Sequence, residues 1–132
     1  MHKKYIVAAA IFGGLAVGAG AFGAHALEAI TSDEKILHSF QTGVQYQLYH
    51  SLVLLAVAFL VDKLDSKWMK WAGTCFITGI ILFSGSLYLL TFFKIQESAA
   101  VKIVGPITPL GGTFFIAGWV CLLIAAVKKR LS

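Results

Sequence analysis

The chain has 132 residues, of which 58% are hydrophobic and only 13% are charged. Soluble domains are closer to half apolar and a quarter charged, and one small water-facing core could not hide this surplus of apolar side chains. The composition therefore excludes an ordinary soluble domain and indicates a membrane protein. The net charge of +5 comes mainly from lysines that flank the apolar segments, so we expect no nucleic-acid partner.

Four apolar segments follow one another along the chain, and each is close to the roughly 20 residues with which a helix crosses a ~30 Å hydrocarbon core. None shows the apolar/polar alternation of a membrane β-strand. We therefore predict an all-α membrane protein, a bundle of four transmembrane helices. It forms a single transmembrane domain over residues 1–132, with helices at about 5–27, 34–62, 70–93 and 105–128.

The first segment has two interpretations. Its basic start and the stretch Ala24-His25-Ala26 fit a signal peptide with a cleavage site. Its apolar run of about 19 residues exceeds the 7–15 typical of such peptides, so we expect it to stay as a membrane helix. Gly14 and Gly18 form a small-xxx-small pair and Gly20 belongs to a second row of small residues. We predict that these three glycines let a neighbouring helix approach closely.

The second segment is the most polar of the four. Thr31, followed three residues later by Glu34, predicts a capping box with Thr31 as the N-cap. One stripe of the helix then carries polar side chains at membrane depth, namely His38, Gln41, Thr42, Gln45 and Tyr49, and His50 lies beside it. Unpaired polar groups are costly in hydrocarbon, so we expect this stripe to face protein or a wet cavity.

The third and fourth segments add further polar or irregular features. Ser84, Tyr88 and Thr91 share one helical face, and the fourth segment opens with GPITPLGG, whose two prolines suit a first helical turn. Cys75 and Cys121 lack a metal-binding or redox spacing and are interpreted as small buried residues.

Basic residues indicate the orientation. Eight of the eleven lysines and arginines precede the first segment, lie between the second and third, or follow the fourth. Because basic residues favour the cytoplasmic side, we predict that both termini are cytoplasmic. The polar features of all four segments then lie towards the outer face.

Because the polar features of the four segments lie at a similar depth in the membrane, they suggest a ligand-binding pocket in the outer half of the bundle. Its predicted lining is His25, Gln45, Tyr49, His50, Ser84 and Tyr88. The alternative is that these residues only end helices or form interhelical hydrogen bonds. Two histidines could ligate a haem iron, whereas a third ligand for a typical zinc site is missing at this depth. No Ser-His-Asp set is present, so we expect neither a metal site nor an enzyme, and the cofactor is unknown.

Four motifs occur in order along the chain: GAFGAHAL, FQTGVQYQLYHSL, LFSGSLYLL and GPITPLGG. Together they resemble the small inner-membrane proteins of domain-of-unknown-function family 423, which are similar to eukaryotic transmembrane protein 256. The resemblance covers nearly the whole chain. It implies a four-helix protein of the bacterial inner membrane, and it implies no activity and no catalytic residues.

Three classes of function remain open. The first is a structural or accessory membrane protein surrounded by lipid, with a possible homo-oligomer through the first helix. The second is a protein that binds a lipid, quinone or haem in the outer-half pocket. The third is a transporter or channel, which the lack of an intramembrane carboxylate and of an internal repeat disfavours. Protein partners are unknown.

Overall fold

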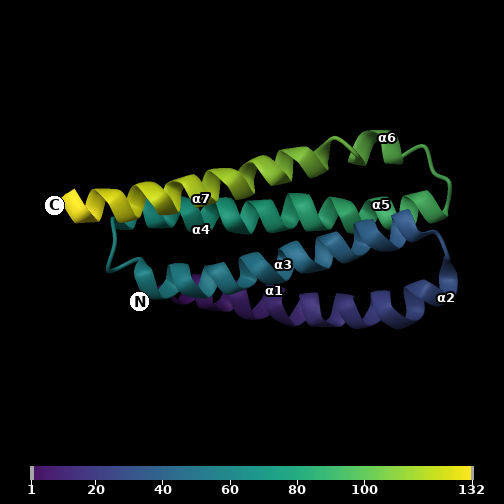
Figure 1. The fold of residues 1–132 in the computed structure, drawn as a ribbon, viewed down its shortest axis with the longest axis horizontal. Coiled ribbons are helices and arrows are strands. Elements are labelled where there is room, and N and C mark those ends of the chain that lie inside the picture. Colours follow the sequence, from purple (N-terminus) through teal and green to yellow (C-terminus); the bar gives the residue numbers. More distant parts are fainter. Residues whose placement is uncertain (1, 132) are drawn as a thin grey trace.

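The computed structural model describes residues 2–131, and the side chains of residues 2–128. Four helical segments are long and apolar enough to cross a membrane, which confirms the predicted all-α membrane protein with four transmembrane helices. Figure 1 shows the segments side by side, with both ends of the chain at one end of the bundle. We call this the terminal end. The opposite end, which holds the connections at 31–33 and 96–100, is the far end.

Two of the four segments contain a π-helical turn. The first segment consists of α1 (Lys3–Phe22), the π turn η1 (Gly23–Leu27) and α2 (Glu28–Ile30), and the second is α3 (Glu34–Leu60). The third consists of α4 (Ser66–Gly79), the π turn η2 (Ile80–Ser84) and α5 (Gly85–Ile95). The fourth consists of the short α6 (Val101–Val104) and α7 (Ile107–Leu131).

Aspartates start the two middle segments. The Asp33 carboxylate accepts hydrogen bonds from the backbone N–H groups of Lys35 at 2.9 Å and Ile36 at 3.4 Å. The Thr31 hydroxyl instead accepts from the N–H of Asp33, before the helix starts. The prediction of Thr31 as the N-cap is therefore wrong, because Asp33 is the extended residue next to the first turn. Asp65 caps α4 in the same way.

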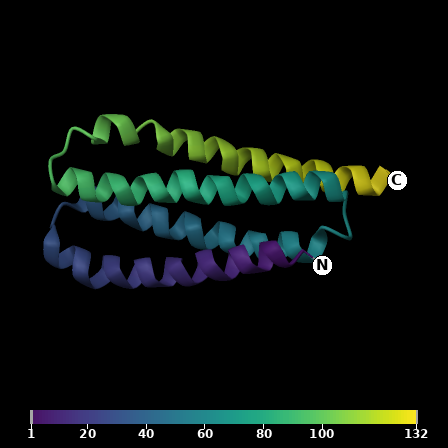
Figure 2. The same cartoon turned by 180° about the vertical axis from the view of Figure 1, so that it is seen from behind.

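The four segments are arranged more as a row than as a closed square. α1 packs on α3, α3 packs on α4 and α5, and α4 packs on α7. Figures 1 and 2 show this order from one edge of the bundle to the other. α1 therefore forms one edge, and its face towards α3 buries Ala9 and Ala16.

The main hydrophobic core fills the terminal half of this row. Tyr5 of α1, Leu54 of α3, and Met69 and Phe76 of α4 are all fully buried in it. The Tyr5 ring lies against the backbone at Gly73, which leaves no room for a side chain there. This contact joins α1 to α4 at the terminal end.

The predicted packing glycines of α1 divide between two faces. A methyl group at Gly20 would lie 3.5 Å from Val44 of α3. At Gly14 and Gly18 it would meet no atom within 4 Å among the described residues. The prediction of close packing through Gly14 and Gly18 is therefore wrong within this chain, because α3 covers the opposite face of α1.

Candidate functional site

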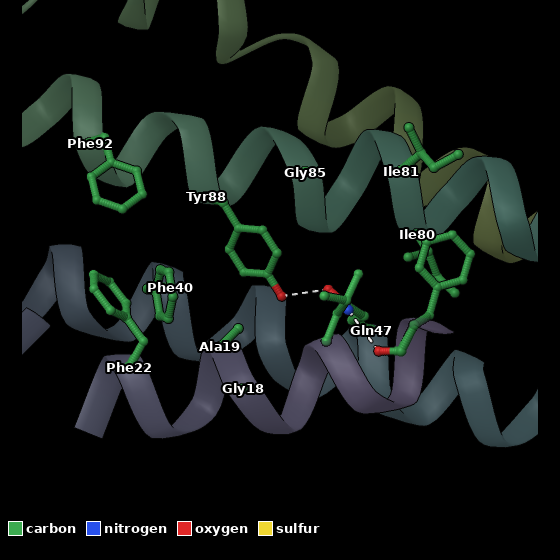
Figure 3. A pocket seen from close by; sticks show the side chains of 12 residues that line it. Gly18, Ala19, Phe22, Phe40, Gln47, Ile80, Ile81, Gly85, Tyr88 and Phe92 are labelled. Atoms are coloured by element: carbon green, nitrogen blue, oxygen red, sulfur yellow. Dashed lines mark hydrogen bonds between the residues drawn. The ribbon is translucent and has the colours of Figure 1, made fainter. Parts of the chain in front are cut away.

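A groove of about 670 Å³ opens between α1 and the η2–α5 segment, with α3 as its floor. It forms because α1 meets α4 at the terminal end and has no comparable contact with α5 further along the bundle. Figure 3 shows the groove, with Gly18 and Ala19 on one wall and Gly85 and Tyr88 on the other. Apart from Gln47 and Tyr88, its lining residues are apolar.

Gln47 and Tyr88 form a polar bridge across the groove. The Tyr88 hydroxyl donates to Gln47 Oε1 at 2.6 Å, and Gln47 Nε2 donates to the backbone carbonyl of Phe12 at 2.8 Å. Both bonds are drawn in Figure 3. The bridge joins α5, α3 and α1, and it turns most of the polar atoms of the groove towards one another.

Three phenylalanines lie at the far end of the groove. The Phe22 ring centre is 5.8 Å from that of Phe40 and 6.1 Å from that of Phe92. Phe22 is ten residues beyond Phe12 in the chain, or about 15 Å along a helix. Gln47 is 13 residues from both Glu34 and Leu60, the two ends of α3. The groove therefore extends from the middle of the membrane into its far half.

Only some of the six predicted site residues face the inside of the bundle. Tyr88 lines the groove, and Ser84 is buried and donates to the carbonyl of Gly43 at 2.6 Å. His25, Gln45 and Tyr49 are exposed on the outside of the bundle. The predicted single pocket is therefore wrong, because the polar stripe of α3 that contains Gln45 and Tyr49 is not covered by the other helices of this chain.

His50 is buried on the other side of α3, in an aromatic cluster. Its ring stacks on Phe115 with the centres 3.7 Å apart. Nδ1 bonds to the carbonyl of Tyr46 at 2.8 Å, and Nε2 accepts from the indole N–H of Trp119 at 3.2 Å. A carbonyl can only accept and an indole N–H can only donate, so these partners fix a neutral ring protonated at Nδ1. His50 thus connects α3 to α7.

His25 and His50 do not approach each other. Gly23 of the first segment lies against Phe40, and Gly13 lies against Ser51, so His25 is level with about residue 38 of α3. That level is about 12 residues, or roughly 18 Å, from His50. The pair of histidines considered for haem is therefore not formed. Within the described residues, no group of three or more His, Cys, Asp or Glu side chains could hold a metal ion.

Gln47 is the central polar residue that the sequence-based site omitted. Its spacing carried a signal, since a second stripe of α3 at intervals of three and four residues contains Phe40, Val44, Gln47, Ser51 and Leu54. All five are buried. The helix therefore has two polar stripes at similar depth, and only one of them faces the bundle.

The fold and the groove define a multi-pass α-helical membrane protein with a lateral cleft. The family described as a protein of unknown function (DUF423) matches residues 19–112. The chain belongs to this family, as its motifs predicted. No solved structure matches the chain.

Curated relatives match over nearly their whole length. The UPF0382 membrane protein YwdK of Bacillus subtilis is 50% identical over 96% of this chain and 98% of the relative. A UPF0382 membrane protein of Haemophilus influenzae is 38% identical over 98% of both chains. The UPF0382 inner membrane protein YgdD of Escherichia coli is 37% identical over 95% of this chain and 90% of the relative.

Proposed function

We propose that this chain is a non-enzymatic accessory protein of the bacterial inner membrane that holds the hydrocarbon chain of a membrane lipid or of an isoprenoid quinone in the groove between α1 and α5. The observation that carries the proposal is the groove itself, apolar along its walls and about 670 Å³ in volume. Ligand pockets in proteins typically occupy about 300–1,000 Å³. The name of the Escherichia coli relative supports the inner membrane as the location.

The rim of the groove favours a ligand that enters from the lipid. Leu15 on α1 is 60% exposed and Ile81 on η2 is 57% exposed, so the two edges present apolar side chains to the bilayer. The bridge between Gln47 and Tyr88 already satisfies much of the hydrogen-bonding capacity at the floor. An apolar chain could therefore lie beside the bridge without leaving polar groups unpaired.

The terminal half of the bundle argues against transport through this groove. Tyr5, Leu54 and Phe76 fill the space between α1, α3 and α4. A solute that entered at the far half would meet close-packed side chains there. The geometry therefore favours binding over passage.

Native mass spectrometry of the detergent-purified protein tests the proposal, with extraction and mass analysis of any retained lipid to distinguish a phospholipid from a quinone. Gly85 lines the groove, and a methyl group there would meet no described atom within 4 Å. Gly85→Leu should therefore fill the groove without disturbing the fold, and we expect it to remove the bound lipid.

Gly14→Leu is the matched control, since a methyl group at Gly14 also meets no atom of the described residues within 4 Å, and Gly14 is not among the residues that line the groove. It should retain the same lipid as the unaltered chain. Equal lipid retention by Gly85→Leu and the unaltered chain, or no retained lipid in either, would overturn the proposal.

A further inference from the structure

The outward face of α3 carries a regular stripe that none of the residues described in the structure covers. Its members are spaced by alternating steps of four and three residues, and all are exposed: Gln41, Gln45, Leu48, Leu52, Leu55 and Phe59. We call these six residues the α3 seam. Such a 3.5-residue spacing is the pattern with which one helix packs along another in a left-handed coiled coil.

Gln45 makes this seam unlike an ordinary lipid-facing surface. It is 11 residues from Glu34 and 15 from Leu60, near the middle of the membrane-spanning helix. No hydrogen bond reaches its side chain from any residue in 2–128, the range whose side chains are described. Because hydrocarbon offers neither donors nor acceptors, an amide at this depth requires a protein partner.

We propose that a second copy of this chain packs against the α3 seam, so that the two α3 helices lie side by side and the two Gln45 amides hydrogen-bond to each other. Both copies enter the membrane in the same orientation, so a two-fold axis relating them runs along the membrane normal. Each residue of the seam then meets its own counterpart at equal depth.

The chemistry of the seam fits this particular partner. A glutamine amide contains both a donor and an acceptor, and it can therefore pair with a copy of itself. α3 has no Lys, Arg, Asp or Glu between Lys35 and Leu60, so two copies meet at membrane depth without repulsion between like charges. Between Gln45 and the terminal end of α3, the leucines of the seam supply apolar packing.

Disulfide cross-linking in bilayers tests the proposal, in a chain whose native cysteines are replaced by Cys75→Ala and Cys121→Ala. Leu48→Cys and Leu52→Cys, each alone, should give cross-linked dimers on mild oxidation. Ile116→Cys is the control, since Ile116 is 67% exposed and lies on α7, away from the seam. It should stay monomeric, and equal cross-linking at Ile116 would overturn the proposal.

A second measurement tests the role of Gln45 itself. The dimer fraction of the purified chain, measured by energy transfer between labelled copies diluted in lipid, should fall with Gln45→Leu and be largely kept by Gln45→Asn. Interhelical hydrogen bonds in membranes predict an approximately three- to twentyfold weaker association for Gln45→Leu. Gly14→Leu, on the outer face of α1, should leave association unchanged.

Two further outcomes would contradict the dimer. One is an unaltered chain that remains monomeric at high density in the bilayer, which would assign the seam to a different protein. The other is a dimer that Gly14→Leu disrupts and Gln45→Leu does not, which would place the contact on α1.

Discussion

Gln47 shows how a polar residue can be accommodated in the middle of a membrane without any partner from outside the chain. Its amide nitrogen donates to the Phe12 carbonyl and its oxygen accepts from the Tyr88 hydroxyl. Because no water competes at this depth, both bonds persist as links between α1, α3 and α5. One side chain therefore links the edge helix α1 to both α3 and α5 near the middle of the membrane.

A double-mutant cycle measures this link. Gln47→Leu and Tyr88→Phe should each lower the free energy of unfolding, Gln47→Leu by about 1–3 kcal/mol because it leaves the Tyr88 hydroxyl without its partner. The coupling between the two changes should be about 0.6–1.7 kcal/mol, the range of interhelical hydrogen bonds in membranes. Reversible unfolding in mixed micelles gives all four stabilities.

Tyr49→Phe is the control for this cycle. Tyr49 is 51% exposed, and its hydroxyl makes no hydrogen bond with residues 2–128. Removing that hydroxyl should change stability by less than about 0.5 kcal/mol. A coupling of zero between Gln47 and Tyr88 would show that the bridge does not form in the folded protein.

The contrast between Gln45 and Gln47 shows what the sequence could reveal of the site. Their depth followed directly from the position of the apolar segment. The position of the apolar segment does not show which of the two glutamines faces the bundle. They are two residues apart and point in nearly opposite directions around the helix. In a soluble helix the apolar face identifies the core, but lipid is as apolar as a protein interior. Both stripes of α3 therefore contain the same kinds of residue.

At the level of elements, the backbones of α7 and η2 approach each other closely at Gly111. A methyl group at Gly111 of α7 would collide with the backbone of Leu82 and Phe83. Backbone atoms cannot relieve such a clash by a change of rotamer, as a flexible side chain can. The fourth segment therefore packs at this point only because residue 111 has no side chain.

Gly111→Ala should consequently lower the stability of the fold, by about 1–3 kcal/mol or more, as expected for an overpacked core. Gly112→Ala is the neighbouring control, since its methyl group would lie 3.8 Å from the Phe83 ring, an ordinary contact distance. It should be neutral, or stabilising by up to about 1 kcal/mol through its better helix propensity. Thermal unfolding in one detergent compares the two variants, and equal stability would show that α7 packs differently.

The elements themselves were largely predictable, because four apolar runs of sufficient length are enough to identify four helices. The π turns at 23–27 and 80–84 were not. Each depends on how a helix fits its neighbours, and η2 lies where Gly111 contacts the backbone. The sequence offers two residues that could cap the start of α3, Thr31 and Asp33. Asp33 acts as the cap because it directly precedes Glu34, the first helical residue.

For the whole molecule, the groove is a consequence of how the four segments are arranged. A closed square of helices would place α1 against two neighbours along its full length, whereas in this row α1 packs mainly on α3 and meets α5 through side chains such as Phe22 and Phe92. Composition cannot distinguish the two arrangements, since α1 is apolar on every face. The choice depends on Tyr5 at Gly73 and on Gln47 at Phe12, two contacts between residues distant in sequence.

The two ends of the molecule differ in charge, and this difference predicts its orientation. Eight of the eleven basic residues lie at the start of α1, in or near the 61–65 turn, or near the end of α7, and Figure 1 places these regions at the terminal end. Because basic residues are retained in the cytoplasm, the terminal end should be cytoplasmic.

In a chain without its two native cysteines, a membrane-impermeant maleimide added to intact spheroplasts should label Gln96→Cys at the far end. It should label Ser66→Cys at the terminal end only after the membrane is opened. Both positions are exposed in the folded chain, so a difference in labelling reports the side of the membrane rather than burial. Labelling of Ser66→Cys in intact spheroplasts, with Gln96→Cys protected, would reverse the orientation and place the mouth of the groove in the cytoplasmic leaflet.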